Sequence, residues 1–199
     1  MAAGTKYNLT PDYKPEELYR VETGVRKSGP WKLDTTNLVA GSVLPVFTPV
    51  EANLKTRVIV PVRNVQVVEA YATGDTATTV KVAKGSLAYV GMFLGSGTKG
   101  AKVTAIDTSN KDYDALTIDA AFGENIEKDA VLFEATAAGG TKKKNTANFV
   151  LFDAKKVETD GPVLCTLLMQ AYEVKESKLH VPIHELDKVG LTSRFQFEY

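Results

Sequence analysis

A regular alternation between short apolar runs and turn residues, over residues 65–136, most constrains what this chain can fold into. Runs rich in Val, Ile, Leu and Ala are separated there by Gly, Asp, Asn, Ser and Thr. Turn signals spaced about 8–12 residues apart are typical of small antiparallel β-domains. The pattern therefore predicts a small β-barrel or sandwich over residues 65–136.

The strand-like segments outside this unit fall into two groups, at residues 41–62 and 149–199. Such a split arises when one β-domain is inserted into an exposed loop of another. We predict an all-β, mainly antiparallel protein with an extended N-terminal arm (1–38), a discontinuous β-unit (39–64 plus 137–199) and an inserted β-barrel-like unit (65–136). We expect residues 136–148 to be an unpacked linker or hairpin tip. In the discontinuous β-unit, we expect helical turns over residues 183–189 that stop at Gly190.

Four separate aromatic residues mark the otherwise polar N-terminal arm: Tyr7, Tyr13, Tyr19 and Trp31. A segment with isolated aromatics and few aliphatics often orders only on a partner. Aromatic side chains are good anchors because they bury a large area for little rotamer entropy. We therefore predict these four residues as docking anchors. The alternatives are a disordered tail, or a strap packed over the chain's own domain.

Charge and cysteine content narrow the function classes. Lys+Arg and Asp+Glu both number 24, so no net field favours nucleic acid or a membrane surface, whereas near-zero charge favours protein association.

The single cysteine, Cys165, excludes an intrachain disulfide and is expected to be buried. The N-terminus lacks a signal-peptide pattern, and no apolar run reaches the ~18–20 residues of a membrane span. We expect synthesis and folding in a reducing cytosol.

Two motifs that could carry chemistry have simpler explanations. Gly95–Gly100 reads G-S-G-T-K-G, but a strand-like segment follows it instead of the helix that a dinucleotide site needs, so a hairpin turn is predicted. His180 and His184 are four residues apart, but Pro182 interrupts any helix between them and no third metal ligand is near.

The remaining charged clusters are expected to be solvated. Asp107, Asp112, Asp114 and Asp119 lack calcium-loop spacing, and Lys142–Lys144 lack the interleaved aromatics of a nucleic-acid site. No nucleophile lies in a motif that would pair it with a base. We therefore expect no enzyme activity, no cofactor and no metal.

A family resemblance takes the interpretation further. Tyr71–Gly85, Tyr89–Leu94, Lys102–Asp107, Asp112–Ile118 and Val131–Ala135 resemble segments of the head fibre and capsid-decoration proteins of tailed bacteriophages and prophages. Ala40–Val46 and Val163–Leu179 are similar to their early and late strands, so the resemblance covers roughly residues 38–180. At Val90–Met92 the chain departs from the family's usual turn, which contains an aspartate.

The resemblance implies a virion structural protein on the outer capsid surface, made in the cytoplasm of a bacterial host. It would bind the major capsid protein through the arm and the discontinuous unit, and display residues 65–136. Deleting residues 2–31 is then expected to abolish capsid binding and leave the fold intact. The alternative is a glycan-binding or adhesin-type module. Its candidate aromatics, mostly in strand-like positions, are Tyr71, Tyr89, Phe93, Tyr113, Phe122 and Phe133.

Self-association is a further expectation. The C-terminal segment Phe195–Tyr199 alternates aromatic and polar residues, which predicts a strand with one aromatic face. Together with zero net charge this favours a homo-oligomer, and a trimer suits the symmetry of capsid surfaces. The alternative is that this strand closes the sheet of its own chain.

Overall fold

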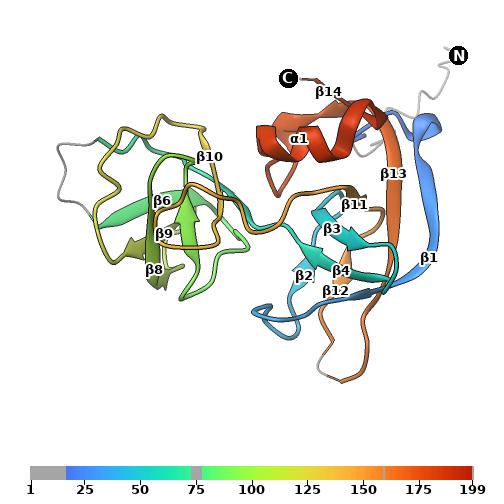
Figure 1. Ribbon diagram of the computed structural model, residues 1–199, viewed down its shortest axis with the longest axis horizontal. Helices are drawn as coiled ribbons and strands as arrows, with labels where there is room; N and C mark the ends of the chain where they lie inside the picture. Colours follow the sequence, from blue (N-terminus) through green and yellow to red (C-terminus); the bar gives the residue numbers. More distant parts are fainter. Residues whose placement is uncertain (1–16, 73–77, 159, 199) are drawn as a thin grey trace, which may run out of the picture.

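The structure is a computed structural model, which describes residues 17–72, 78–158 and 160–198. It consists of two β-lobes lying side by side (Figure 1). In chain order the elements are η1 (Val21–Thr23), β1 (Val25–Leu33), β2 (Val43–Leu44), β3 (Pro49–Asn53), β4 (Val58–Pro61), β5 (Asn64–Gln66), β6 (Thr79–Ala83), β7 (Phe93–Gly95), β8 (Gly100–Asp107), β9 (Tyr113–Ile118), β10 (Val131–Glu134), β11 (Phe149–Leu151), β12 (Lys155–Lys156), β13 (Leu164–Lys175), η2 (Glu176–Lys178), α1 (Glu185–Leu191), η3 (Thr192–Arg194) and β14 (Phe195–Glu198).

The lobe on the right of Figure 1 is a closed ring of strands, here called the first barrel. Its order is β1-β4-β3-β11-β13, and β13 pairs back onto β1 to close it. β14 extends β13 in parallel, so the C-terminal strand completes a sheet of its own chain, as one of the two sequence alternatives proposed. The small β2–β12 sheet and α1 complete the lobe.

Alternation along β11 divides the first barrel's apolar side chains into two clusters. Phe149 and Leu151 join one cluster with Trp31 and Leu167. The intervening Val150 joins the other, which also contains side chains from α1 and β14: Leu191 and Phe195. Successive strand residues point to opposite faces, so this short strand is buried on both sides.

The lobe on the left, the second barrel, contains the strands between residues 64 and 134. Its antiparallel order is β5-β10-β7-β8-β9-β6. The first and last strands approach each other through the bridge between Val67 and Val82, where the Val68 amide donates to the Lys81 carbonyl at 3.0 Å. Valine, leucine and isoleucine from all its strands fill one core. The predicted all-β, mainly antiparallel fold is confirmed.

Two segments, here called the neck, connect the barrels: residues 62–64 lead out and residues 135–148 return. The prediction that residues 136–148 cannot pack is wrong. Gly140 has φ +63°, and a Cβ there would lie 2.0 Å from the Lys99 carbonyl oxygen. Lys143, predicted to be solvated, is buried. Glycine therefore serves for close backbone approach here, and not for an open loop.

Two further expectations need correction. Residues 25–33, assigned to the N-terminal arm, form β1 and supply a wall of the first barrel. Gly190 does not stop α1, which continues to Leu191. A Cβ at Gly190 would lie 2.2 Å from the Ala147 carbonyl oxygen, so this glycine lets the helix contact the neck.

In the part of the chain that the structure describes, no helix has both the length and the apolar character needed to cross a membrane.

Candidate functional site

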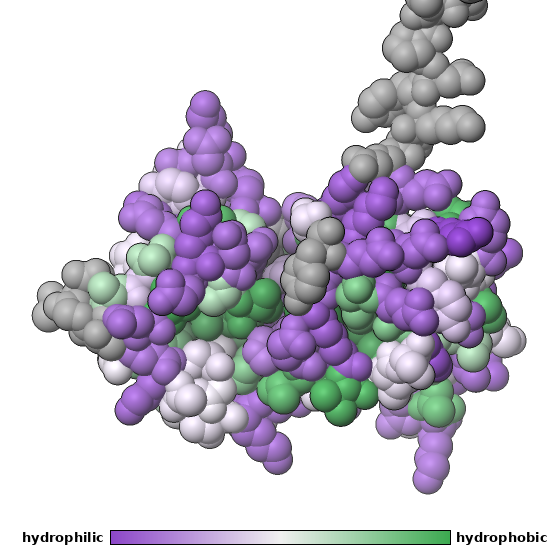
Figure 2. Space-filling view, turned by 90° about the horizontal axis from the view of Figure 1, so that it is seen from above, coloured by the Kyte–Doolittle hydropathy of each residue, from purple (hydrophilic) through white to green (hydrophobic). Residues whose placement is uncertain are grey.

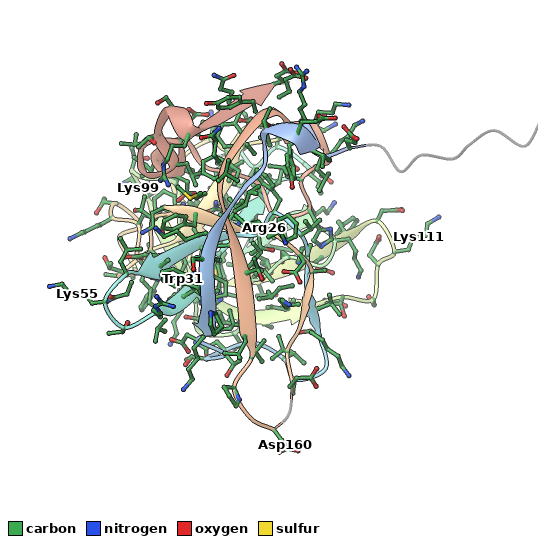
Figure 3. All side chains as sticks on the ribbon, turned by 90° about the vertical axis from the view of Figure 1, so that its right-hand side faces the viewer. Arg26, Trp31, Lys55, Lys99, Lys111 and Asp160 are labelled. Carbon is green, nitrogen blue, oxygen red and sulfur yellow. The ribbon has the colours of Figure 1, made fainter. Side chains whose placement is uncertain are left out.

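Two of the four predicted anchors, Tyr7 and Tyr13, lie outside the described residues. Trp31 is 2% exposed in β1, and its ring centroid lies 6.3 Å from that of Phe149 in the core of the first barrel. Its indole N–H donates to the Ser28 carbonyl at 3.2 Å. Figure 3 shows it within the strands of this barrel, whereas Lys55 and Asp160 project from loops.

Tyr19 is also packed inside its own chain. It is 9% exposed, and its ring centroid lies 5.7 Å from that of Phe47. Burial raises the pKa of its hydroxyl, an effect that the charge of Arg26 partly opposes. Tyr19 and Trp31 therefore hold the N-terminal segment onto the first barrel, in the manner of the strap that was one alternative for this segment.

Exposed apolar side chains gather at one end of the first barrel, here called the α1 end, which carries η1, α1, β14 and both ends of the described chain (Figure 1). Val21 in η1 and Val25 at the start of β1 are exposed, and so are Leu186 and Val189 on α1, with Val189 75% exposed. Figure 2 views this end and shows separate hydrophobic patches on a mainly hydrophilic surface. The exposed apolar side chains at this end therefore do not form one continuous patch.

Local capping and ion pairs fix α1 in place. The His184 Nδ1 accepts from the Leu186 amide at 3.1 Å, and the Asp187 carboxylate accepts from the His184 amide at 3.3 Å, which forms a reciprocal cap. Lys188 pairs with Glu176 at 2.6 Å and with Glu185 at 2.7 Å. Burial lowers the pKa of Lys188, but these two hydrogen bonds outweigh it and raise the pKa overall.

A cleft of about 350 Å³ separates the barrels. Leu38, Val39 and Val43 line it from the first barrel, and Leu87 lines it from the second. His180 also lines it, and its Nε2 lies 3.3 Å from the Gly85 carbonyl oxygen. The cleft is a second exposed apolar surface, but it contains no cluster of charged side chains.

The two histidines have separate surroundings, since His180 faces the cleft and His184 caps α1. No group of three or more His, Cys, Asp or Glu side chains that could hold a metal occurs among residues 17–72, 78–158 and 160–198. The predicted hairpin at Gly95–Gly100 is confirmed: these residues pair across β7 and β8, and the Ser96 amide donates to the Lys99 carbonyl at 2.9 Å.

One acidic residue differs from expectation, because Asp114 is buried. Its carboxylate accepts from the Gly85 amide at 2.8 Å and pairs with Lys84 at 2.9 Å, which ties the loop after β6 to β9. Of the candidate glycan-contacting aromatics, Tyr71 and Phe122 belong to the core of the same barrel and Tyr89 packs against it. Tyr71, Phe122 and Phe133 are buried, and Tyr89, Phe93 and Tyr113 are half-buried. None of the six forms an exposed stacking platform.

A buried ionic group in the neck was not predicted. The Glu134 carboxylate accepts from Arg63 at 3.1 Å, Lys144 at 2.7 Å and the Tyr89 hydroxyl at 2.6 Å. Burial alone would raise the pKa of Glu134, but the hydrogen bonds from Lys144 and Tyr89 and the charge of Arg63 outweigh it and lower the pKa. The group fixes both neck segments to the second barrel.

These features describe a two-barrel protein with exposed apolar side chains at the α1 end and in the cleft between the barrels. The comparison with curated proteins gives no significant match, and neither does the comparison with solved structures. A family model described as "Head fiber protein" matches residues 2–196, which is nearly the whole chain. The chain therefore belongs to the phage head fibre family, whose members are structural proteins of the phage particle.

Proposed function

We propose that this protein decorates the outer surface of a phage capsid, where it binds the major capsid protein through the first barrel and the N-terminal segment and displays the second barrel, residues 65–136. The family match over residues 2–196 carries this proposal. The protein would be made in the cytoplasm of the bacterial host and assembled onto the head, with no cofactor and no turnover.

The α1 end supports a docking role for the first barrel. The described chain begins there at Glu17, so residues 1–16, with Tyr7 and Tyr13, are connected directly to this surface. Val21, Val25 and the outer face of α1 supply exposed apolar area beside it. In Figure 1 the second barrel lies beside the first, so after docking here the loops of the second barrel that point away from the α1 end would remain exposed.

The structure changes the deletion that tests this docking. Removal of residues 2–31 would take away most of β1 and open the first barrel, so lost binding would report unfolding. Deletion of residues 2–16 removes Tyr7 and Tyr13 and keeps Tyr19 and β1. We expect this shorter chain to fold and to lose co-sedimentation with capsids that lack the fibre protein.

A matched pair of surface variants tests the orientation. Val189→Glu places a charge on α1, and Val90→Glu places the same charge on the second barrel at a residue that is 59% exposed. We expect the first variant to reduce capsid binding at least tenfold and the second to leave it unchanged. Failure of the wild-type chain to bind capsids, or loss of binding only in the second variant, would contradict the proposal.

A homo-oligomer, with a trimer favoured, remains part of the proposal. Light scattering coupled to size-exclusion chromatography, on the free protein and at the concentration used for capsid binding, measures the mass of the assembly directly. A trimeric mass supports the expectation, and a monomeric mass at both concentrations contradicts it.

A further inference from the structure

Three buried polar residues from separate segments meet in the neck: Asn64 at the start of β5, Lys143 in the returning segment and Asp187 in α1. Their exposures are 1%, 8% and 0%. Lysine and aspartate are rarely buried unless paired, and burial of all three polar side chains at one point has a substantial energetic cost. The group therefore requires an explanation.

Hydrogen bonds arrange these side chains in a closed triangle. The Lys143 Nζ donates to the Asn64 Oδ1 at 2.7 Å and to the Asp187 Oδ2. The Asn64 Nδ2 donates to the same Asp187 Oδ2 at 2.8 Å and to the Pro182 carbonyl at 2.8 Å. Since a C=O bond measures about 1.2 Å, the Lys143 Nζ lies within about 4 Å of the Asn64 Cγ. One carboxylate oxygen thus contacts both the amine and the amide nitrogen.

Burial of the Lys143 amine makes its neutral, nucleophilic form more accessible than it is for a lysine in water. Lys143 Nζ lies 5.6 Å from the centroid of the buried Phe133 ring, and His184 packs edge-on against that ring at 4.9 Å. Burial lowers the pKa of Lys143, and the charge and hydrogen bond of Asp187 only partly oppose this effect. A desolvated lysine is an activated nucleophile. The Ala147 amide donates to the Asp187 Oδ1 at 2.9 Å, which fixes the carboxylate in position.

The neighbouring Glu134 group shows what distinguishes this triangle. Glu134 pairs with Arg63 and Lys144, but within the described part of the chain no side-chain amide is hydrogen-bonded to either cation. That arrangement is a buried ion pair. In the triangle, the Asn64 amide presents its carbonyl to the Lys143 amine and its nitrogen to the Asp187 carboxylate. An electrophile (Asn64), a nucleophile (Lys143) and a proton carrier (Asp187) therefore lie together.

We propose that Lys143 and Asn64 become joined by an intramolecular isopeptide bond, with Asp187 as the acid–base residue. A proton passes from the Lys143 Nζ to the Asp187 carboxylate, and the neutral amine attacks the Asn64 Cγ. The bond between Nζ and Cγ forms, and the bond between Cγ and Nδ2 breaks. Asp187 gives its proton to Nδ2, and the departing Nδ2 group also takes the second proton lost from Nζ. The products are therefore one secondary amide and one ammonium ion.

This reaction needs no oxidant, metal or cofactor, because an ammonium and a primary amide become a secondary amide and an ammonium. Its acceleration comes from proximity and from exclusion of water, which together replace a bimolecular step by a positioned one. The product would join the outgoing and returning segments of the neck. It would close residues 64–143, including the whole second barrel, into a covalent loop.

Mass spectrometry of the full-length protein tests the bond directly. The digest first identifies the N-terminal residue of the protein, and the expected mass is calculated from the sequence beginning there. We expect the denatured wild-type chain to be lighter than this calculated mass by one ammonia molecule. Fragmentation of a protease digest should find one branched peptide that joins Lys143 to Asn64, with no tryptic cleavage after Lys143.

Three variants connect the mass difference to these residues. Lys143→Arg and Asp187→Asn should both have the full sequence mass, since the first removes the nucleophile and the second removes the proton carrier. Lys144→Arg is the matched control, because this adjacent lysine contacts Glu134 and lies outside the triangle. It should keep the mass difference and the branched peptide.

The wild-type measurement decides the proposal even if a variant fails to fold, because it is made on the denatured native sequence. A wild-type chain at its full sequence mass, with linear peptides containing Asn64 and Lys143, would overturn it. Loss of one water, with a branch at Asp187, would overturn it in favour of a different bond. Loss of ammonia without a branched peptide would also contradict it.

Discussion

Replacement of Trp31 by alanine separates a role in the core from a role in docking. Trp31 lies in the core of the first barrel, where it contacts the ring of Phe149 and where Arg57 lies 5.9 Å from its ring centroid. Truncation of a buried tryptophan to alanine typically costs about 3–5 kcal/mol of unfolding free energy. For a chain of this size, about 2–4 °C per kcal/mol converts this cost to a fall of about 6–20 °C in Tm.

Differential scanning calorimetry is the suitable assay, because Trp31 is the only tryptophan and its removal abolishes indole fluorescence. Val39→Ala serves as the control, since Val39 is exposed and surface substitutions usually change the free energy of unfolding by no more than about 0.5 kcal/mol. A residue that acted only as an anchor on the capsid would behave like Val39. An unchanged Tm for Trp31→Ala, together with reduced capsid binding, would refute the assignment of Trp31 to the core.

Three further perturbations test the neck and its contacts. Glu134→Gln leaves the buried Arg63 guanidinium without a charged partner, so urea titration at neutral pH should show a loss of about 3–5 kcal/mol in the free energy of unfolding. Because the pKa of Glu134 is lowered in the folded state, the wild-type chain should lose this advantage as the pH falls below 4.5, and the stability of the variant should depend less on pH. Burial lowers the pKa of His184, so the folded state binds fewer protons than the unfolded state, and stability should fall as the pH decreases below 6.5. In urea titrations at pH 7.5 and 5.5 a His184→Asn variant should lack this decrease, and an equal decrease in the variant would show that His184 does not cause it. Gly140→Ala should lower the free energy of unfolding by at least about 1–2 kcal/mol because of its positive φ and its contact with the adjacent hairpin, whereas Gly139→Ala, with nothing within 4 Å, should have little effect in the same titration.

Local sequence pattern was sufficient for the second barrel. Val80 and Val82 alternate with polar residues, and both are buried. The glycines at 95 and 100 mark a hairpin because each element on either side is itself strand-like. These signals depend on neighbours within a few residues, so they are visible without knowledge of distant contacts.

The same reasoning failed where distant segments decide the structure. β1 has only Trp31 and Leu33 buried, and Gly29–Pro30 interrupts its sequence, so nothing local predicts a strand. Its backbone partners come mainly from β13, which lies more than a hundred residues later. Lys143 was expected in solvent for a similar reason, because the groups that stabilise its burial, Asn64 and Asp187, are close only in the folded chain.

The ring closure of the first barrel also sets an order of events during synthesis. All strands of the second barrel leave the ribosome before β11 and β13, without which β1, β3 and β4 cannot form a closed ring. Domains generally fold as units as they emerge. The second barrel is thus expected to fold first, while the N-terminal strands wait for their partners. Asp187 arrives later still, so the proposed cross-link at Lys143 could form only after both barrels are in place, and its presence would mark a completely folded chain.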